Sequence, residues 1–341
     1  MAGFDLPDQT PVHQPVLVEE TISLLGTACG GVEFMIDGTL GEGGHSEVFL
    51  SRFADLQICG VDADEKILQV AKARLEKFGG RISYYHGWSE NFFAEIAKKD
   101  ERHKADIILI DLGVSLYHYE KGDRGFSFGK NEALDMRIDI NCGEPASDLV
   151  NNLGQESLAG LLFNNADEHF SRRIAKAIVR QRSFGKITTS SQLAEIVAAA
   201  YPYLSGHSAG KKRRGGNRGG KREHPATKTF QALRIAVNGE LYKLPPRLQA
   251  ALDALKCGGR LGVISFHSIE DRIVKNFFRD KSRGLGGLVD GMPKTDGTPI
   301  IKEESAFKII TKKAVPPTYE ETQKNPASRS AKLRVIQKVS I

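Results

Sequence analysis

The first third of the chain alternates short apolar runs with amphipathic segments. Segments Ser46–Phe53 and Glu65–Phe78 repeat their apolar residues at helical spacing, which predicts helices. Strands that alternate with helices are typical of a parallel sheet with helical crossovers. The apolar runs, each a predicted strand, are Val32–Asp37, Leu56–Val61, Arg81–Tyr85 and Asp106–Leu112.

This alternation stops near Asp123 and resumes near His224. The residues between them give almost only helical signals, clearest in Ser171–Arg182 and Ser190–Tyr201. The second of these opens on Thr189–Gln192, which fits a capping box. We therefore predict one α/β domain, residues 1–122 and 225–341, split by an inserted and mostly helical domain, residues 123–224.

The last third predicts further helices and strands. Gly258 and Gly259 suit the end of one of its helices, and Ser268 suits the N-cap of another. The predicted elements are helices at Ala226–Leu241, Pro245–Lys256 and Ser268–Arg279, a buried strand at Arg260–Ser265, and a closing antiparallel pair at Phe307–Lys313 and Ala331–Val339.

The composition gives the chain a positive net charge. The formal net charge is +6, but 42 acidic residues offset most of the 48 basic ones, so the total points only mildly to nucleic acid. The tract Ser205–Glu223 concentrates Lys, Arg and Gly and cannot bury a core.

Patterns that the sequence lacks indicate the cellular compartment of the protein and whether it binds a metal. Met1–Pro15 lacks the pattern of a signal peptide, and no apolar run reaches the ~18 residues of a membrane span. The four cysteines show neither metal-ligand spacing nor a disulfide framework. We therefore expect a cytoplasmic protein without a metal site.

A glycine-rich turn, Asp37–His45, links the first predicted strand to the first predicted helix. Open α/β sheets bind ligands at this end of their strands, and glycines let the backbone approach a ligand closely. Asp62 ends the second strand ~20 residues past the turn, where a carboxylate can accept both ribose hydroxyls of a nucleoside. A tight turn without a ligand, and a helix-capping role for Asp62, are the alternatives.

The same pattern leaves the identity of the nucleoside open. NAD and S-adenosylmethionine share this geometry. The spacing Gly41-x-Gly43-Gly44 is not followed by the third Gly or Ala of the dinucleotide fingerprint, which departs from NAD-binding proteins.

Two more residues at strand ends are candidates for acid–base chemistry. Asp111 follows the fourth apolar run, where a carboxylate can orient an exocyclic amine or take its proton. His267 follows the strand Arg260–Ser265 and can accept a proton or stack on a base. An Asp that caps a loop and a purely structural His are the alternatives.

A basic helix face accompanies these candidates. Arg172, Lys176 and Arg180 are spaced four apart in the predicted helix Ser171–Arg182. Cations on a rigid helix supply salt-dependent affinity for a nucleic-acid backbone, although a solvated charged face is the alternative. The tract Ser205–Glu223 strengthens the nucleic-acid interpretation, because Arg/Gly-rich segments bind RNA.

Eight segments, in order along nearly the whole chain, match one known family. Together they resemble the MraW/RsmH family of bacterial 16S rRNA cytosine-N4 methyltransferases. The segments are His13–Leu17, Asp37–Thr39 with Gly43–Ser46, Asp111–Ser115, Asp123–Phe128, Leu134–Arg137, His224–Arg234, Ile264–Arg272 and Asn325–Ser330.

This resemblance implies a Rossmann-like class I methyltransferase core with an inserted, mostly helical domain. It implies S-adenosyl-L-methionine as the methyl donor and a cytosine in the decoding region of 16S rRNA, in the small ribosomal subunit, as the target. The oligomeric state is not predicted. The cofactor contacts that it implies are Gly43, Gly44, His45, Asp62 and Asp111, with two departures from the family pattern at Ser89, often Phe, and His118, often Gln.

The proposed chemistry needs a proton acceptor and a stacking surface for a base lifted from its helix. Asp111 is the first candidate acceptor and His267 the second, while Phe126, Phe128 or Phe266 can provide the stacking surface. Two rival functions remain: a nicotinamide-dependent oxidoreductase, and a non-catalytic rRNA-binding factor of ribosome assembly.

Overall fold

The structure is a computed structural model that describes residues 14–28, 31–201, 224–283 and 305–340. The tract Ser205–Glu223, most of the expected loop Arg283–Glu304, His13 and Cys29 lie outside these residues. The chain divides into two compact units. We name Met1–Ser115 with Tyr242–Ile341 the core unit, and Leu116–Leu241 the helical unit.

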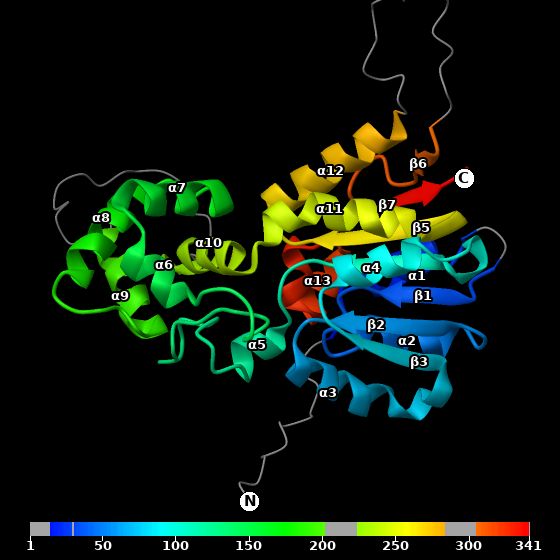
Figure 1. Cartoon of the computed structure of the whole chain (residues 1–341), viewed down its shortest axis with the longest axis horizontal. Helices are drawn as coiled ribbons and strands as arrows, with labels where there is room; N and C mark the ends of the chain where they lie inside the picture. Colours follow the sequence, from blue (N-terminus) through cyan, green and yellow to red (C-terminus); the bar gives the residue numbers. More distant parts are fainter. Residues whose placement is uncertain (1–13, 29–30, 202–223, 284–304, 341) are drawn as a thin grey trace, which may run out of the picture. The chain divides into compact units, whose positions relative to one another are not determined.

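The core unit contains a seven-stranded sheet of order β3-β2-β1-β4-β5-β7-β6 (Figure 1). Neighbouring strands from β3 to β5 pair in parallel, and β7 is antiparallel to both β5 and β6. The predicted closing antiparallel pair and the Rossmann-like class I methyltransferase fold are thereby confirmed. The strands are β1 Phe34–Asp37, β2 Gln57–Asp62, β3 Ile82–His86, β4 Ala105–Asp111, β5 Leu255–Ser265, β6 Phe307–Ile309 and β7 Lys332–Lys338.

The apolar run of β4 explains how this sheet is buried. Ile108 and Ile110 face one hydrophobic cluster, and Ile107 and Leu109 face a second one. Successive strand residues point to opposite faces, so a strand covered on both sides must be apolar throughout.

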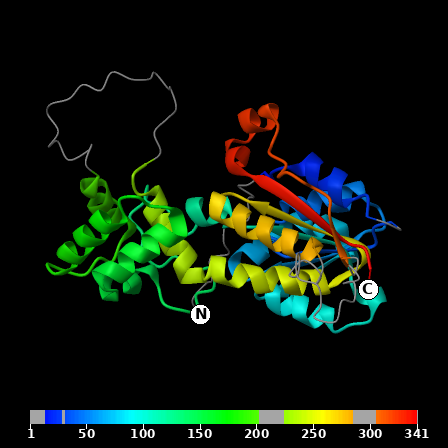
Figure 2. The same ribbon diagram turned by 90° about the horizontal axis from the view of Figure 1, so that it is seen from above.

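Helices cover both faces of the sheet. The first cluster includes residues of α4, α11 and α12, and the second includes residues of α1, α2 and α3. Helices α11 and α12 lie side by side (Figure 1, Figure 2). The core helices are α1 Val18–Leu25, α2 Gly44–Arg52, α3 Glu65–Leu75, α4 Ser89–Ala97, α11 Glu240–Asp253, α12 Ser268–Ser282 and α13 Tyr319–Lys324, with short 3₁₀ turns at Glu76–Arg81, Glu101–His103 and Pro326–Ser330.

The helical unit consists of short helices around a small apolar core. Helix α8 has the predicted bounds, and α9 begins with the predicted capping box between Thr189 and Gln192. Its helices are α5 Leu116–Glu120, α6 Ala146–Asn152, α7 Gln155–Ala166, α8 Ser171–Arg182, α9 Ser190–Ala200 and α10 Thr227–Asn238.

Three predicted element bounds in the last third are wrong. Helix α11 begins at Glu240 rather than Pro245, so Pro245 and Pro246 lie inside the helix instead of opening it. Gly258 and Gly259 belong to β5, not to a helix end. The N-cap of α12 is His267 rather than Ser268, since the His267 side chain accepts the Glu270 amide.

The inserted unit extends further than residues 123–224. Helix α10 belongs to it and packs on α7, where Asn165 donates to the Ala232 carbonyl. Asn238, at the end of α10, binds the segment before α6: its side chain accepts from the Ile138 amide and donates to the Met136 carbonyl, both at 2.9 Å. Sequence periodicity shows a helix here but not which core it joins.

Asn238 is buried, so replacing its side chain should destabilise the helical unit. Asn238→Ala leaves a buried carbonyl and a buried amide without partners, and we expect a loss of about 2–4 kcal/mol in the free energy of unfolding. Urea denaturation measures this loss. Asn164→Ala, on the exposed side of α7, is the control and should change stability by less than about 0.5 kcal/mol. Equal stability of the two variants would contradict this role.

Candidate active site

The glycine-rich turn after β1 is fastened to both neighbouring strands. On one side the Leu40 amide donates to the Val61 carbonyl (2.9 Å) and the Gly41 amide to Asp62 Oδ2 (2.8 Å). On the other side the Gly38 amide donates to the Leu109 carbonyl, 2.8 Å away. These bonds fix the turn against the carboxyl ends of β2 and β4.

The fold itself requires the predicted cofactor glycines. Gly43 has φ +79°, and a Cβ there would lie 2.8 Å from Leu75 Cδ1 of α3. A Cβ on Gly44 would lie 3.0 Å from Pro15 Cδ. Any contact of these glycines with a cofactor therefore comes from their backbone, at the N-terminus of α2, where no side chain caps the helix.

Asp62 braces this turn. Its Oδ2 accepts the Gly41 amide, and its Oδ1 accepts the Asp64 amide at 2.9 Å. The cap of α3 is Asp64, whose side chain accepts the Lys66 amide. The alternative role of Asp62 as a helix cap is therefore wrong, and its carboxylate orders the turn next to which a nucleoside would bind.

Asp111 ends β4 on the other side of the turn. Its amide donates to Thr39 Oγ1 (2.6 Å), and its Oδ2 lies 3.8 Å from His45 Nε2. Its Oδ1 is buried and has no hydrogen-bond partner among the described residues. Burial, followed by the charges of Asp37 and Glu270, raises the pKa of Asp111 well above its usual value. A carboxylate with a raised pKa is a stronger base, so this group suits proton transfer.

Three buried acids near the turn were missed by sequence reasoning. Asp37 accepts Ser46 Oγ at 2.7 Å, and its burial raises its pKa to about 6. Glu42 accepts Ser115 Oγ at 2.9 Å. Glu270 accepts the Phe266 amide at 3.0 Å. The signal available for Asp37 was its place as the last residue of the first strand.

His267 has a structural task at the end of β5. Its Nδ1 accepts the Glu270 amide (3.4 Å), and its Nε2 lies 2.9 Å from Glu270 Oε1. These contacts orient the start of α12. Its expected part as a proton acceptor stays a prediction.

The two positions that depart from the family pattern lie in different units. Ser89 is buried at the start of α4, directly after Trp88, whose ring is covered by Lys243 Nζ, 4.2 Å from the ring centroid. His118 lies on α5 of the helical unit, where its ring packs against Phe126 with the centroids 5.0 Å apart. The roles of Ser89 and His118 in cofactor binding stay predictions.

Within the core unit, the predicted residues share one edge of the sheet. The turn, Asp62, Ser89, Asp111 and His267 each end or follow one of the five neighbouring strands β3, β2, β1, β4 and β5. The strand order reverses between β1 and β4, and open α/β sheets bind ligands outside the carboxyl ends of strands at such a point.

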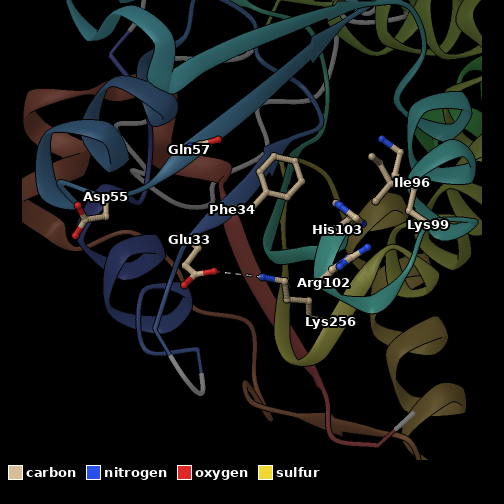
Figure 3. A pocket seen from close by; sticks show the side chains of 9 residues that line it. All are labelled: Glu33, Phe34, Asp55, Gln57, Ile96, Lys99, Arg102, His103 and Lys256. Carbon is tan, nitrogen blue, oxygen red and sulfur yellow. Dashed lines mark ion pairs between the residues drawn. The ribbon is translucent and has the colours of Figure 1, made fainter.

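A cavity of about 540 Å³ lies at the opposite edge, where β1 and β2 begin (Figure 3). Charges of both signs line it, and Lys256 pairs there with Glu33 at 3.9 Å and with Asp106 at 3.1 Å. This combination of paired positive and negative side chains does not indicate a particular class of ligand. The lining residues are Glu33, Phe34, Asp55, Gln57, Ile96, Lys99, Arg102, His103 and Lys256.

Within the described residues, no group of three His, Cys, Asp or Glu side chains could hold a metal ion. The same part of the chain contains no helix long and apolar enough to cross a membrane.

The sheet order and the glycine turn between β1 and α2 define a Rossmann-like protein, whose ligand edge is expected at the carboxyl ends of the strands. The particular family follows from comparison: the model of the MraW methylase family matches residues 10–339, and the chain belongs to this family. The resemblance seen in the sequence is thereby confirmed.

Relatives match along almost the whole chain. A protein of Treponema denticola named "Ribosomal RNA small subunit methyltransferase H" is 44% identical over 96% of this chain and 98% of its own length. A protein of Treponema pallidum with the same name is 41% identical over 96% and 92% of the two chains. The chain also matches the solved structure of a putative methyltransferase of Streptococcus mutans in complex with SAH, at 12% identity, with 96% of this chain and 99% of that one covered and a TM-score of 0.37.

The raised pKa of Asp37 predicts a pH dependence of stability. The folded chain holds this proton more tightly than the unfolded chain, because the pKa is about 6 rather than 3.8. The stability from this group is therefore complete below about pH 3.8 and is lost as the pH rises through about 6. Asp37→Asn removes that loss. We expect its free energy of unfolding, relative to the unchanged protein, to rise by on the order of 3 kcal/mol between about pH 4 and about pH 7.

Urea denaturation across this pH range measures the difference. Asp55→Asn is the matched control, because Asp55 is exposed, and its difference from the unchanged protein should stay flat with pH. A flat difference for Asp37→Asn as well would show that the buried carboxyl does not carry this effect.

Proposed function

We propose that this chain transfers a methyl group from S-adenosyl-L-methionine to N4 of a cytosine in 16S rRNA of the small ribosomal subunit. Its membership of the MraW methylase family and the names of its relatives support methylation of small-subunit rRNA. The observation that carries the finer proposal is Asp111, a partly buried carboxylate with a buried Oδ1 beside the glycine turn, at the point where the strand order reverses.

The residues at this edge suit a cationic nucleoside. Asp37 and Asp111 interact unfavourably with one another, as do Asp111 and Glu270, and Asp111 Oδ1 is buried without a partner among the described residues. A bound positive charge relieves such crowding of carboxylates. The pyrophosphate of a dinucleotide would add two negative charges next to buried Glu42 and Asp37, which disfavours the nicotinamide-dependent oxidoreductase.

S-adenosylmethionine, when bound, supplies a methyl group on a positively charged sulfur. We assign its contacts to Gly43, Gly44 and His45 at the N-terminus of α2, to Asp62 for the ribose hydroxyls, and to Ser89 and Asp111. A contact from His118 stays a prediction from the family resemblance. The backbone amides of Gly44 and His45 open α2 and can donate hydrogen bonds to the cofactor.

Asp111 has the central chemical role in this proposal. The lone pair of a cytosine amine is delocalised into the ring, so N4 becomes a better nucleophile when a carboxylate accepts one of its protons. Asp111 is that acceptor in its ionised form, and its Thr39 hydrogen bond holds the backbone at the strand end. His267 is the second candidate, although its ring is engaged by Glu270.

The base also needs a stacking surface once it has left its helix. Phe126 is buried beneath His118 and Tyr119, and Phe128 is stacked on His224 with the ring centroids 4.3 Å apart. Phe266 directly precedes His267 and is only half-buried. Of the three candidates, Phe266 therefore best suits a stacked cytosine.

Removal of the Asp111 carboxylate should strongly lower turnover while the fold persists. We expect Asp111→Asn to lower kcat by about 10²- to 10⁴-fold, the usual contribution of a general base. Activity of the unchanged protein should fall as the pH is lowered, because only ionised Asp111 accepts a proton, and the fall should begin well above the usual pKa of an aspartate.

Circular dichroism and calorimetric titration with S-adenosylmethionine test whether the variant folds and binds the cofactor. Asp100→Asn, at an exposed acid, is the control and should keep full activity. Full activity in Asp111→Asn would remove this residue from the mechanism.

The whole proposal is tested by incubating purified small ribosomal subunits with the protein and a labelled methyl donor, followed by nucleoside analysis. N4-methylcytidine is the expected product. A label on ring carbon C5 or on the ribose would refute the N4 chemistry. RNA binding without any label would favour the non-catalytic assembly factor, and binding of NAD in place of S-adenosylmethionine would favour the oxidoreductase.

A further inference from the structure

Helix α8 of the helical unit has two contrasting sides. Ile174, Ala175 and Ile178 are buried in the core of the unit. Four of its five exposed positions carry Arg172, Arg173, Lys176 and Arg180, the fifth is Gln181, and the helix sequence contains no acidic residue. The exposed side is therefore cationic and carries no negative charge.

These four cations are not used by the fold. None of them forms an ion pair within the described part of the chain, whereas Arg182, at the end of the same helix, donates to the Val150 carbonyl at 2.8 Å. Surface cations usually contribute little to stability, and like charges one turn apart on a helix repel each other. This grouping of cations does not stabilise the fold, but it would attract a bound polyanion.

An exposed aromatic ring lies directly beyond this helix. Phe184 is 78% exposed in the turn that follows α8, with Arg182 before it and Lys186 after it. The turn is ordered by hydrogen bonds from the Phe184 amide to the Gln181 carbonyl (3.0 Å) and from Ser183 Oγ to the Arg180 carbonyl (2.7 Å). The backbone at Phe184 is therefore held in place although its ring is largely open to solvent.

We propose that these residues, Arg172, Arg173, Lys176, Arg180, Phe184 and Lys186, form a surface that binds unpaired RNA. We name it the α8 surface. Its cations bind successive phosphates and the Phe184 ring stacks on an unpaired base. A surface that combines cations with an aromatic ring suits single-stranded RNA. Each unpaired base can stack on an aromatic ring, and each phosphate carries a charge that a cation can neutralise.

Charge complementarity selects RNA over a protein partner. A single exposed ring is too small for a stable protein interface, and a second copy of the chain would oppose cation to cation. The inference rests on the proposed function, since it names where the RNA substrate is held outside the active site.

Removal of two cations should weaken RNA binding in a salt-dependent way. We expect the double variant Lys176→Gln/Arg180→Gln to lower the slope of log K against log salt by about 1.4, or ~0.7 for each phosphate of a single strand that is no longer neutralised. Fluorescence anisotropy with a short single-stranded RNA of mixed sequence measures this. Lys312→Gln/Lys313→Gln is the control, because it removes two exposed lysines of the core unit and should leave the slope unchanged.

Removal of the ring should discriminate between single-stranded and duplex RNA. Phe184→Ala should weaken binding of the single strand roughly 5- to 100-fold and leave binding of a duplex unchanged, because paired bases offer no free face. Phe184→Trp should restore the affinity. Tyr319→Ala is the matched control: Tyr319 is 74% exposed but is followed by Glu320 and Glu321, and its removal should have no effect.

Methylation of small subunits separates this inference from the proposed function. We expect the α8 variants to raise KM for the subunit and to keep kcat. If the unchanged protein methylates subunits and the α8 variants match it in KM and in RNA affinity, the α8 surface is not the RNA site and the proposed function stands. If the unchanged protein neither binds RNA nor methylates subunits, the proposed function itself fails. A change of self-association in Phe184→Ala with unchanged RNA binding would assign the ring to an interface between copies and overturn the inference.

Discussion

The candidate site depends on one constraint: the glycine turn after β1 is hydrogen-bonded to the strands on both sides of it. The Gly38 amide reaches β4, the Leu40 amide reaches β2, and Thr39 Oγ1 accepts the amide of Asp111. The turn can therefore not move without moving the acids at the ends of both strands. This coupling holds a backbone suited to a ligand and two carboxylates in one rigid arrangement.

The same constraint creates an electrostatic cost. Parallel strands end at one edge, so acids at their ends are brought close together and away from water, and the pKa values of Asp37 and Asp111 rise in consequence. A ligand with a positive charge offsets this cost and a neutral one does not. On the proposed function, the cationic donor is held by these carboxylates, and the neutral thioether that remains after transfer loses that attraction. The site would then favour its substrate over its product.

Sequence patterns predicted the parts of the molecule that local rules determine. The strands, the bounds of α8 and the capping box of α9 follow from periodicity and from short-range hydrogen bonds. The positions of Asp62 and Asp111 at the ends of β2 and β4 could be predicted, because the carboxyl ends of parallel strands meet at one edge. The partner acid Glu270 was not found, because it lies on α12 and reaches the site only through tertiary packing. For the same reason, periodicity could not show that α10 joins the core of α7.

The acidic residues at the site also bear on the cations of helix α8. A carboxylate cluster repels the phosphates of an RNA strand, so the core unit can bind the donor at this edge but gains little affinity for the backbone of the substrate there. Affinity for RNA must then come from cations elsewhere in the chain. Helix α8 supplies them without one acidic neighbour in its own sequence, on a unit whose fold does not need them. On the proposed function, carboxylates of the core unit bind the cationic donor, and cations of the helical unit bind the anionic acceptor.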